Sequence, residues 1–506
     1  MSRDRFDFSA PVPPVEELGA VHFIALGGSG VSGVARMFLD HGVTVSGSDQ
    51  QDSPTLRSLE QAGAQVHVGH DAAHLGGAGT VVVSGAVRED NPELAAARAA
   101  GLRVLHRSQG IAALLHGRPA VAVAGANGKT TTSAMTTAAL QAAGVDPGYV
   151  IGAPLASNGR SAELGAPGAP LVVEADESDG SFLTYRPQVA VVTNVQPDHL
   201  DFYGDVAAVE AAYRDFVATI ADGGLLITSL DDPGAARLAQ DAAAGGTRVV
   251  TWGAHGADVQ LDEVVSDGLT SAGTLTFRTA AGPVAPGTTL RLRLPVPGEH
   301  SVHDAVAALL VATAGLGLPL DRAVAGLESF AGAHRRFERV GSLGPVEVVD
   351  DYAHNAPKVA AAVRAARSAA GGRRLVVAFQ PHLFSRTRDF ADGFAEGLAG
   401  ADVVLLLPVY PARERAEDFP GITSDLLGDR LVARDGDVPA VHTAGSVDEA
   451  APALRDLVAE GQDTLVVTIG AGDVTRVGRE LLTLLQDDAD AGTQAHVGAG
   501  SPGVVP

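Results

Sequence analysis

Residues 120–132 read AVAVAGANGKTTT, an apolar run followed by a glycine-rich turn, a lysine and three threonines. The apolar run predicts a buried strand, and the residues after the turn predict a helix over 131–143. Glycines allow backbone N–H groups to face a phosphate, and a helix N-terminus favours negative charge. The stretch therefore predicts a strand, a phosphate loop and a helix that bind ATP or GTP.

The lysine of this loop is one of only two lysines, Lys129 and Lys358, among 36 basic residues. A compact ammonium fits between β- and γ-phosphates, whereas a planar guanidinium does not. A lysine at this position, in a chain that otherwise uses arginine, therefore supports the nucleotide site. The strict Walker spacing is absent because Val123 stands where its first glycine belongs, and the shorter Gly125-x-x-Gly128-Lys129-Thr130 remains. We expect Thr130 to ligate Mg²⁺ and Lys358 to lie at the surface.

Composition and charge narrow the class of protein. The 506 residues are 46% hydrophobic and 4% aromatic and include no cysteine, so we expect two to four domains without disulfides or zinc–thiolate sites. A formal net charge of −24 argues against nucleic acid or an anionic membrane as a partner. No apolar stretch reaches the roughly 18 residues that span a bilayer, and residues 1–17 lack a signal-peptide core. We expect a cytoplasmic protein, as a monomer or homodimer.

Strand-like apolar runs alternate with Ala- and Leu-rich helical stretches in three successive units. This alternation predicts an α/β fold with a Rossmann-like domain over 1–117, a central phosphate-loop domain with a mostly parallel sheet over 118–333, and a second Rossmann-like domain over 334–485. The polar, glycine-rich residues 253–289 predict short strands and loops. The Gly- and Asp-rich residues 486–506 predict a disordered tail.

Acidic residues gather where two predicted strands of the central unit end. Residues 174–179 read EADESD directly after an apolar run, and residues 193–201 read TNVQPDHLD after the next run. Carboxylate oxygens at the carboxyl edge of a parallel sheet, beside a phosphate loop, suit Mg²⁺. We therefore expect Glu174 and His199 to act as metal ligands.

The first unit carries its own phosphate pattern. Gly28-x-Gly30-x-x-Gly33 lies between a predicted strand and helix, and Ser48-Asp49 follows the second strand. This arrangement is typical of a pyrophosphate site with an acid placed for a ribose. NAD is one candidate ligand, and a nucleotide-linked substrate is another, since the chain already has a predicted ATP site. The residues expected to bind it are Gly28, Ser29, Gly30, Val31, Ser32, Ser48 and Asp49.

The third unit also places polar residues beside its predicted strands. Residues 335–338 read RRFE, residues 350–355 read DDYAHN after one strand, and residues 379–388 read FQPHLFSRTR at the end of the next. Sites of α/β proteins are built at the carboxyl ends of strands, and arginines there hold carboxylates or phosphates. We therefore expect the third unit to bind an anionic group.

In this order, these motifs resemble the muramyl peptide ligase (Mur ligase) family over nearly the whole chain, up to residue 485. The residues that carry the resemblance are GGSGVSG at 27–33, GSD at 47–49, GKTTT at 128–132, EADESD at 174–179, DHLD at 198–201, DDYAH at 350–354 and FQPH at 379–382. The family implies a UDP-binding domain, an ATPase domain and a C-terminal Rossmann-like domain.

The resemblance also implies a reaction. ATP phosphorylates the muramate carboxylate of UDP-N-acetylmuramate, and the amine of L-alanine attacks the resulting acyl phosphate, in the first peptide step of peptidoglycan precursor synthesis. The absence of lysine from residues 206–220 also fits alanine, because the alanine-adding branch is similar in lacking the carbamylated lysine that several sister ligases carry there.

Single residues receive roles from the same resemblance. Catalysis is assigned to Lys129, Glu174, His199, His354 and Arg386. ATP is assigned to Gly125, Ala126, Asn127, Gly128, Lys129, Thr130, Thr131, His300, Asp304, Arg336 and Asp351. The substrate end is assigned to His382 and Arg386, and Mg²⁺ to Thr130, Glu174 and His199.

The chain departs from the family pattern at three places. Ala126-Asn127 stand for Thr-His in the loop, His300-Ser301-Val302-His303-Asp304 stand for His-Asn-x-x-Asn near the adenine, and Asn355-Ala356-Pro357-Lys358 stand for His-Pro-Thr-Glu. Three alternatives stay open: a ligase that adds a murein peptide to the same sugar nucleotide, an NAD-dependent oxidoreductase, and a nucleotide-binding protein that has lost catalysis.

Overall fold

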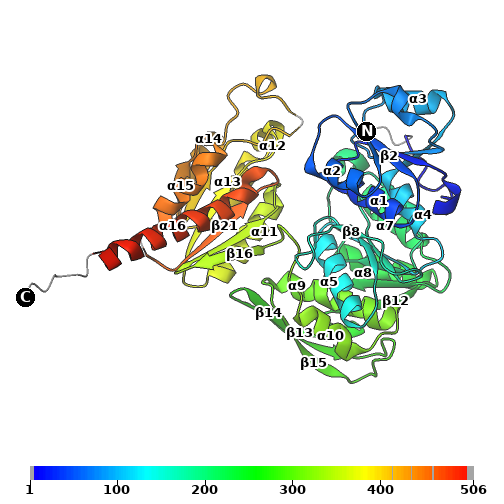
Figure 1. Ribbon diagram of the computed structural model, residues 1–506. Helices are drawn as coiled ribbons and strands as arrows, with labels where there is room; N and C mark the ends of the chain where they lie inside the picture. The colour runs from blue at the N-terminus through cyan, green and yellow to red at the C-terminus, as the bar shows by residue number, and fades with distance from the viewer. Residues whose placement is uncertain (1–4, 413, 435, 459–460, 499–506) are drawn as a thin grey trace, which may run out of the picture. The chain divides into compact units, whose positions relative to one another are not determined.

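The computed structural model describes residues 5–412, 414–434, 436–458 and 461–498, and its ribbon is drawn in Figure 1. Contacts divide the chain into two compact units. The first comprises Met1–Val265, Ala272–Pro295 and Glu299–Ala331, and the second comprises Ser266–Ser271, Val296–Gly298 and Gly332–Pro506. Three sheets provide the framework, two built mainly from the first unit and one from the second.

The first sheet has five parallel strands in the order β3-β2-β1-β4-β5. Its central strand is fully buried, as expected of a parallel strand covered by helices on both faces. The chain leaves this strand in both directions across the sheet, so a crevice-forming switch point lies at its carboxyl end. The elements are η1 (Val15–Glu17), β1 (Val21–Ile24), α1 (Ser29–Asp40), β2 (Val45–Asp49), α2 (Pro54–Gln61), β3 (Gln65–Val68), η2 (Ala72–Leu75), β4 (Thr80–Val83), α3 (Pro92–Ala99), β5 (Arg103–His106) and α4 (Arg107–Leu114).

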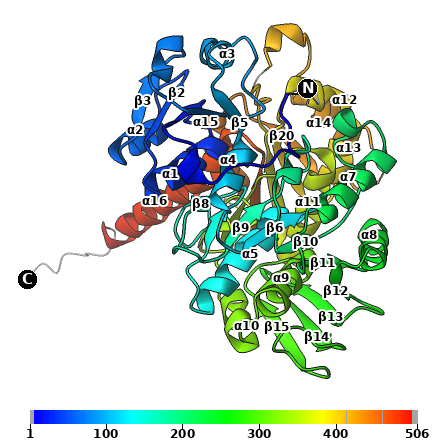
Figure 2. The same cartoon turned by 90° about the vertical axis from the view of Figure 1, so that its right-hand side faces the viewer.

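The second sheet has ten strands in the order β15-β14-β13-β12-β11-β10-β6-β9-β7-β8, and β10 to β15 can be followed across it in Figure 2. The predicted phosphate-loop strand is β6, which is completely buried, and α5 follows it and packs against α9 and α10. The elements are β6 (Ala120–Ala124), α5 (Lys129–Ala142), β7 (Gly148–Val150), β8 (Ala162–Glu163), β9 (Leu171–Glu174), η3 (Ser181–Thr184), β10 (Val189–Val192), α6 (Leu200–Tyr203), α7 (Val206–Ala218), β11 (Leu225–Ser229), α8 (Pro233–Ala244), β12 (Arg248–Gly253), β13 (Val259–Asp267), β14 (Thr270–Phe277), β15 (Thr289–Leu294), α9 (Glu299–Leu310), the π-helical turn η4 (Val311–Gly315) and α10 (Leu320–Glu328).

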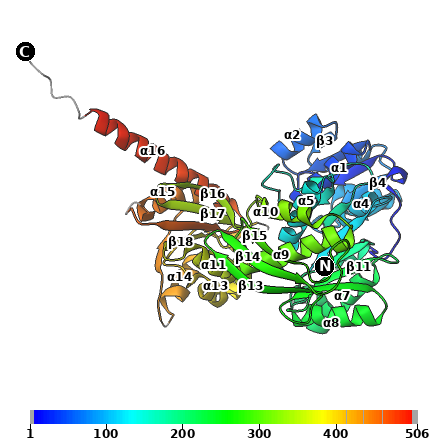
Figure 3. The same cartoon turned by 90° about the horizontal axis from the view of Figure 1, so that it is seen from below.

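The third sheet has six strands in the order β16-β17-β21-β18-β19-β20, all parallel except the antiparallel β16. Helices α11, α13 and α14 cover one face and α15 and α16 the other, as Figure 3 shows. The elements are β16 (Glu338–Leu343), β17 (Val346–Asp351), α11 (Ala356–Ala370), β18 (Arg374–Phe379), α12 (Phe384–Asp389), α13 (Ala391–Leu398), β19 (Val403–Leu406), η5 (Ala416–Asp418), α14 (Asp425–Val432), β20 (Ala440–Thr443), α15 (Val447–Val458), β21 (Thr464–Ile469), η6 (Asp473–Arg476) and α16 (Val477–Gly498).

Two expectations from the sequence need correction. Residues 253–289 form long rather than short strands, because β13 spans 9 and β14 spans 8 residues. Alternate residues of β14 are buried, so a period of two holds the strand despite its glycine. The predicted disordered tail is wrong for 486–498, which continue α16 without a proline to interrupt it. Residues 499–506 lie outside the described part of the chain.

The core of the third sheet yields a stability prediction. Phe394 of α13 is fully buried, whereas Phe390, four residues earlier, is 57% exposed. We expect Phe394→Ala to lower the free energy of unfolding by about 3–5 kcal/mol through lost burial and a cavity. Phe390→Ala is the matched control and is expected to change it by less than about 1 kcal/mol. The free energy of unfolding of both variants is measured by denaturant unfolding. Equal losses in the two variants would contradict this account of the core.

Candidate active site

The phosphate loop joins β6 to α5 and requires its two glycines. Gly125 and Gly128 have φ of 133° and 86°, in the range that side chains avoid. A Cβ on Gly128 would stand 2.5 Å from the Asp304 carboxylate, and one on Gly125 would collide with the Thr193 hydroxyl. Since α5 begins at Lys129, the loop delivers this side chain at a helix N-terminus.

Lys129 is enclosed rather than solvated. Its Nζ donates to the carbonyl oxygens of Gly125 and Ala126 at 2.6 and 3.4 Å and to Glu177 Oε1 at 2.8 Å. Burial alone would lower the pKa of Lys129, but the negative charge of Glu177, with Glu174 and Asp176 behind it, raises the pKa above its ordinary value. The ammonium is therefore charged and held within the loop.

Asn127, where the family pattern has histidine, is tied to the loop after β10. Its N–H donates to Asn194 Oδ1 at 3.0 Å, and its carbonyl accepts from Thr193 Oγ1 at 2.6 Å. Its side-chain amide donates to Gln196 Oε1 at 3.2 Å. An amide thus replaces the imidazole without leaving the loop unsupported.

Glu174 and Thr130 meet at the edge of the loop. Thr130 Oγ1 donates to Glu174 Oε1 at 3.1 Å, and the N–H of Gly152 donates to Glu174 Oε2 at 2.6 Å. Glu174 is the last residue of β9, which pairs with β6 in parallel. The sheet therefore brings together two of the three predicted metal ligands.

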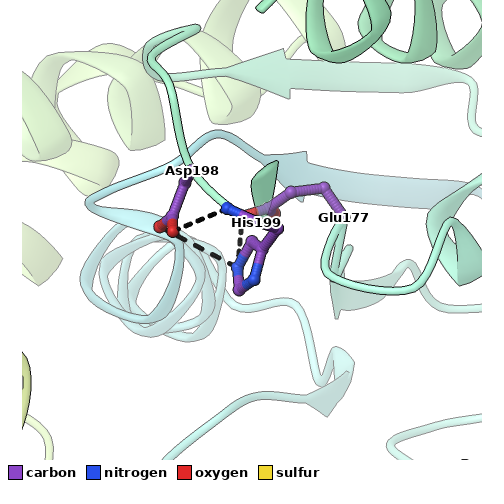
Figure 4. Close-up of side chains that lie close together, drawn as sticks. All are labelled: Glu177, Asp198 and His199. Carbon is purple, nitrogen blue, oxygen red and sulfur yellow. Dashed lines mark hydrogen bonds and ion pairs between the residues drawn. The ribbon is translucent and has the colours of Figure 1, made fainter. Parts of the chain in front are cut away.

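His199, the third predicted metal ligand, lies near acidic residues other than Glu174. Ligand atoms of Glu177, Asp198 and His199 all lie within 4.8 Å of one another, and Figure 4 shows the three side chains facing each other. His199 Nε2 is 3.8 Å from Glu177 Oε1 and 3.8 Å from Asp198 Oδ2. Sequence reasoning singled out the EADESD motif but not Glu177, because spacing alone does not say which carboxylate turns inward.

This trio fits a divalent cation. Glu177 is buried, and its Oε2 has no hydrogen-bond partner among the described residues. Burial raises the pKa of the Glu177 carboxyl above its ordinary value, against the opposing charge of Lys129. Two carboxylates and an imidazole form a usable donor set, although Mg²⁺ prefers oxygen.

Asp304 of α9 lies close to the loop at Gly128. Its Oδ1 accepts from Thr132 Oγ1 at 3.0 Å, and its Oδ2 is buried without a hydrogen-bond partner in the described chain. Burial raises the pKa of Asp304 to about 7. Burial also lowers the pKa values of His300 and His303 at the start of the same helix.

The glycine-rich turn of the first domain is joined to the end of β2. The N–H of Gly27 donates to Asp49 Oδ2 at 2.9 Å, and α1 begins at Ser29. The guanidinium of Arg107 lies against Gly30, close enough to collide with any Cβ there. Arg107 is half-buried and forms no hydrogen bond or ion pair within residues 5–412, 414–434, 436–458 and 461–498. Sequence reasoning missed this cation because Arg107 and Gly30 are far apart in the sequence, and only the fold brings them together.

The second compact unit corresponds to the third unit of the sequence analysis. Its predicted site residues lie near the ends of β17 and β18. Asp351 accepts from the N–H groups of Phe337 and Ala353 at 2.9 and 2.8 Å, and burial raises its pKa against the charge of Arg336. The guanidinium of Arg336 lies 5.7 Å from the centre of the Tyr352 ring. This grouping joins the RRFE and DDYAHN motifs.

The two predicted histidines of this unit lie together. The rings of His354 and His382 are 5.7 Å apart, and Arg386 donates to the carbonyl oxygen of His354 at 3.2 Å. Burial lowers the pKa of His354 to about 4. Lys358, expected at the surface, is half-buried, because the first turn of α11 lies beside this group.

Family models match most of the chain. A model for the Mur ligase catalytic domain matches residues 20–118, a middle-domain model matches 123–312, and a model for the glutamate ligase domain matches 335–472. The chain therefore belongs to the Mur ligase family, and the three-domain α/β organisation is confirmed. The exact boundaries at residues 117 and 333 stay predictions.

Individual relatives show which members of the family this chain is similar to. The UDP-N-acetylmuramate–L-alanine ligase of Kineococcus radiotolerans is 49% identical over 94% of this chain and 98% of its own length. The crystal structure of the UDP-N-acetylmuramate–alanine ligase of Thermotoga maritima has a TM-score of 0.75 and 26% identity, over 93% of this chain and 99% of its own. A murein peptide ligase of Psychrobacter arcticus has a TM-score of 0.64 and 25% identity, over 92% of this chain and 98% of its own. Among the described residues, no helix has the length and apolar composition needed to cross a bilayer.

The protonation of Asp304 gives a pH prediction. Its folded pKa of about 7 exceeds the ordinary value of 3.8, so the folded state holds the proton more tightly than the unfolded state. The stability contributed by the neutral carboxyl is complete below the ordinary value and is lost as pH rises toward the folded pKa. The loss is at most about 4 kcal/mol. We expect Asp304→Asn to flatten the decline in melting temperature between acidic and neutral pH, and an unchanged slope would contradict the burial of a protonated acid.

Metal binding by the trio can be tested without turnover. Glu177→Gln removes one carboxylate while keeping its shape, so we expect the dissociation constant for Mn²⁺, measured by electron paramagnetic resonance, to rise about tenfold or more. Asp179→Asn, in the same motif but outside the trio, is the matched control. Equal affinities of the unmodified protein and Glu177→Gln would show that the trio holds no metal.

Proposed function

We propose that the protein is an ATP-dependent ligase that joins L-alanine to the muramate carboxylate of UDP-N-acetylmuramate, in the first peptide step of peptidoglycan precursor synthesis. One observation carries the proposal: in a chain of the Mur ligase family, Lys129 stands in the phosphate loop, bonded to Gly125 and Glu177. The 49% identical relative, matched over nearly its whole length, bears the name of this activity.

Alanine rather than a murein peptide is favoured by the relatives. The crystal structure of the alanine ligase has a TM-score of 0.75 against 0.64 for the murein peptide ligase, and the 49% identical relative is also named for alanine. Because the chain belongs to the Mur ligase family, we set aside the NAD-dependent oxidoreductase, the hypothesis that the glycine pattern of the first domain had suggested. A protein that has lost catalysis stays an alternative for the assay below, although Asn127 is well supported in the loop.

The reaction balances in two steps. A carboxylate oxygen of the muramate attacks the γ-phosphorus of ATP, and ADP leaves. The amine of alanine then attacks the acyl carbon, loses a proton, and expels inorganic phosphate that carries the former carboxylate oxygen. Phosphorylation matters because a free carboxylate has no adequate leaving group, whereas phosphate leaves readily.

The chain's own residues supply charge and position for the first step. The β- and γ-phosphates would compete with Glu177 for the ammonium of Lys129, and the backbone N–H groups at the start of α5 would donate to the same anions. Glu174 and Thr130 lie beside the loop, and the Glu177 trio faces Lys129. Divalent cations bound by these residues would neutralise charge that develops between carboxylate and phosphate.

The ends of the substrate are assigned to the other domains. The turn at Gly28 to Ser32 and the guanidinium of Arg107, which lies against Gly30, suit a diphosphate, and Asp49 suits the ribose. Arg336 and Asp351 are assigned to ATP, and His354, His382 and Arg386 to the reacting end of the substrate, as the family resemblance implies. These assignments are predictions for each residue.

The test is a phosphate-release assay with defined substrate pairs. We expect release only when ATP, UDP-N-acetylmuramate and L-alanine are all present, and a rate at least about 10³-fold lower for Lys129→Met, which removes the charge but keeps the length of the chain. The control is that Lys129→Met is still folded, as judged by circular dichroism, and still binds UDP-N-acetylmuramate. A preference for a tripeptide over alanine would favour the murein peptide ligase, and no turnover with any pair would favour lost catalysis.

A further inference from the structure

A buried carboxylate organises the carboxyl edge of the first sheet. Glu93 of α3 is completely buried and faces Ser48 at the end of β2 and His70 and His74 after β3. Ser48 Oγ donates to Glu93 Oε2 at 2.5 Å. His70 Nδ1 lies 3.0 Å from Oε2, and His74 Nδ1 lies 3.0 Å from Oε1. One acid thus holds a serine and two histidines.

These contacts decide the tautomer of His70. A carboxylate only accepts hydrogen bonds, so the proton of a neutral His70 must be on Nδ1. The hydroxyl proton of Ser48 is directed at Glu93, and Ser48 Oγ, 2.9 Å from His70 Nδ1, is therefore a second acceptor for that proton. In that neutral ring the other nitrogen, Nε2, carries no proton and accepts hydrogen bonds.

His70 lies at the edge where the first domain is expected to hold its nucleotide. The N–H of Gly69 donates to the carbonyl oxygen of Asp49 at 2.7 Å, and Asp49 in turn holds the N–H of Gly27 in the glycine-rich turn at 2.9 Å. The side chain of His70 is 20% exposed, whereas that of Glu93 is 0% exposed. The ring therefore joins a buried anchor to an accessible surface beside the predicted ribose acid.

Resting on the function proposed above, we propose that Glu93 positions His70 as the residue that selects uridine, with His70 Nε2 accepting the N3–H of uracil. Uracil carries a donor at N3, whereas cytosine carries an acceptor there. A histidine fixed as an acceptor therefore favours uridine and opposes cytidine, because two acceptors facing each other leave both unpaired. His70 is the specificity-determining residue, and Glu93 acts through it as a positioning residue.

The groups around Glu93 keep it ionised. Burial would raise its pKa, but His22, Ser48 and His74 lower it to about 2. His22 Nε2 of β1 is 3.7 Å from Glu93 Oε1, and the ring of His67 in β3 stacks on His74 at 4.1 Å. Burial and the neighbouring histidines lower the pKa of His67. Among the residues that the structure describes, His22, His70 and His74 are the titratable groups that face Glu93.

The experiment measures the binding of UDP and CDP by calorimetry. It compares the unmodified full chain with three variants. We expect the unmodified protein to bind UDP about tenfold or more tightly than CDP, the effect of one mispaired hydrogen bond. His70→Gln places a rotatable amide near Nε2, which pairs with either base, so the preference is expected to fall below about threefold. Glu93→Gln is expected to reduce the preference as well, with unchanged affinity for ATP.

His74→Gln is the matched control, because it removes a histidine from the same carboxylate through the other oxygen. It is expected to keep the preference for UDP. Nitrogen-15 NMR should show His70 protonated on Nδ1 in the unmodified protein and a mixture of tautomers in Glu93→Gln. This readout separates positioning from a merely structural role.

The outcomes distinguish this inference from the function on which it rests. Failure of the unmodified protein to bind UDP would overturn both. Tight UDP binding with the same preference in His70→Gln, or an equal loss in His74→Gln, would overturn this inference alone. A His70 protonated on Nε2 in the unmodified protein would overturn it as well.

Discussion

The ion pair between Lys129 and Glu177 is the interaction on which the rest of the central site depends. An ammonium that is only 14% exposed is costly unless partners replace its water, and here two backbone carbonyl oxygens and one carboxylate do so. The loop can present those carbonyls only because Gly125 and Gly128 adopt positive φ. The carboxylate is available because β9 runs parallel to β6 and delivers its acidic segment to the same edge.

The same geometry links charge to chemistry. Glu177 bonds Lys129 and also belongs to the trio with Asp198 and His199, so one carboxylate connects the phosphate loop with the segment after β10. Two buried carboxyls with raised pKa values contact the start of α5, Glu177 at Lys129 and Asp304 at Thr132. Perturbed acids around a phosphate loop are expected where a triphosphate and a carboxylate must be brought together.

Much of this structure could be predicted from the sequence, and the predictions that failed did so for physical reasons. Strands such as β6 and β10 were predictable because they are buried on both faces and read as continuous apolar runs. The phosphate loop was predictable because glycine and lysine have few substitutes there. The acid that pairs with Lys129 was not, since Glu174 and Glu177 are three residues apart and only the turn after β9 decides which one faces the ammonium. Arg107 and Glu93 were missed because tertiary contacts, rather than local patterns, give them their neighbours.

The most direct test of the account follows an oxygen atom. UDP-N-acetylmuramate labelled with oxygen-18 in the muramate carboxylate would be incubated with ATP and L-alanine, and the inorganic phosphate analysed by mass spectrometry. If ATP bound at the phosphate loop phosphorylates the muramate carboxylate, each phosphate released is expected to carry one labelled oxygen, because the acyl phosphate breaks between carbon and oxygen. Phosphate free of label, with product formed, would contradict the central claim.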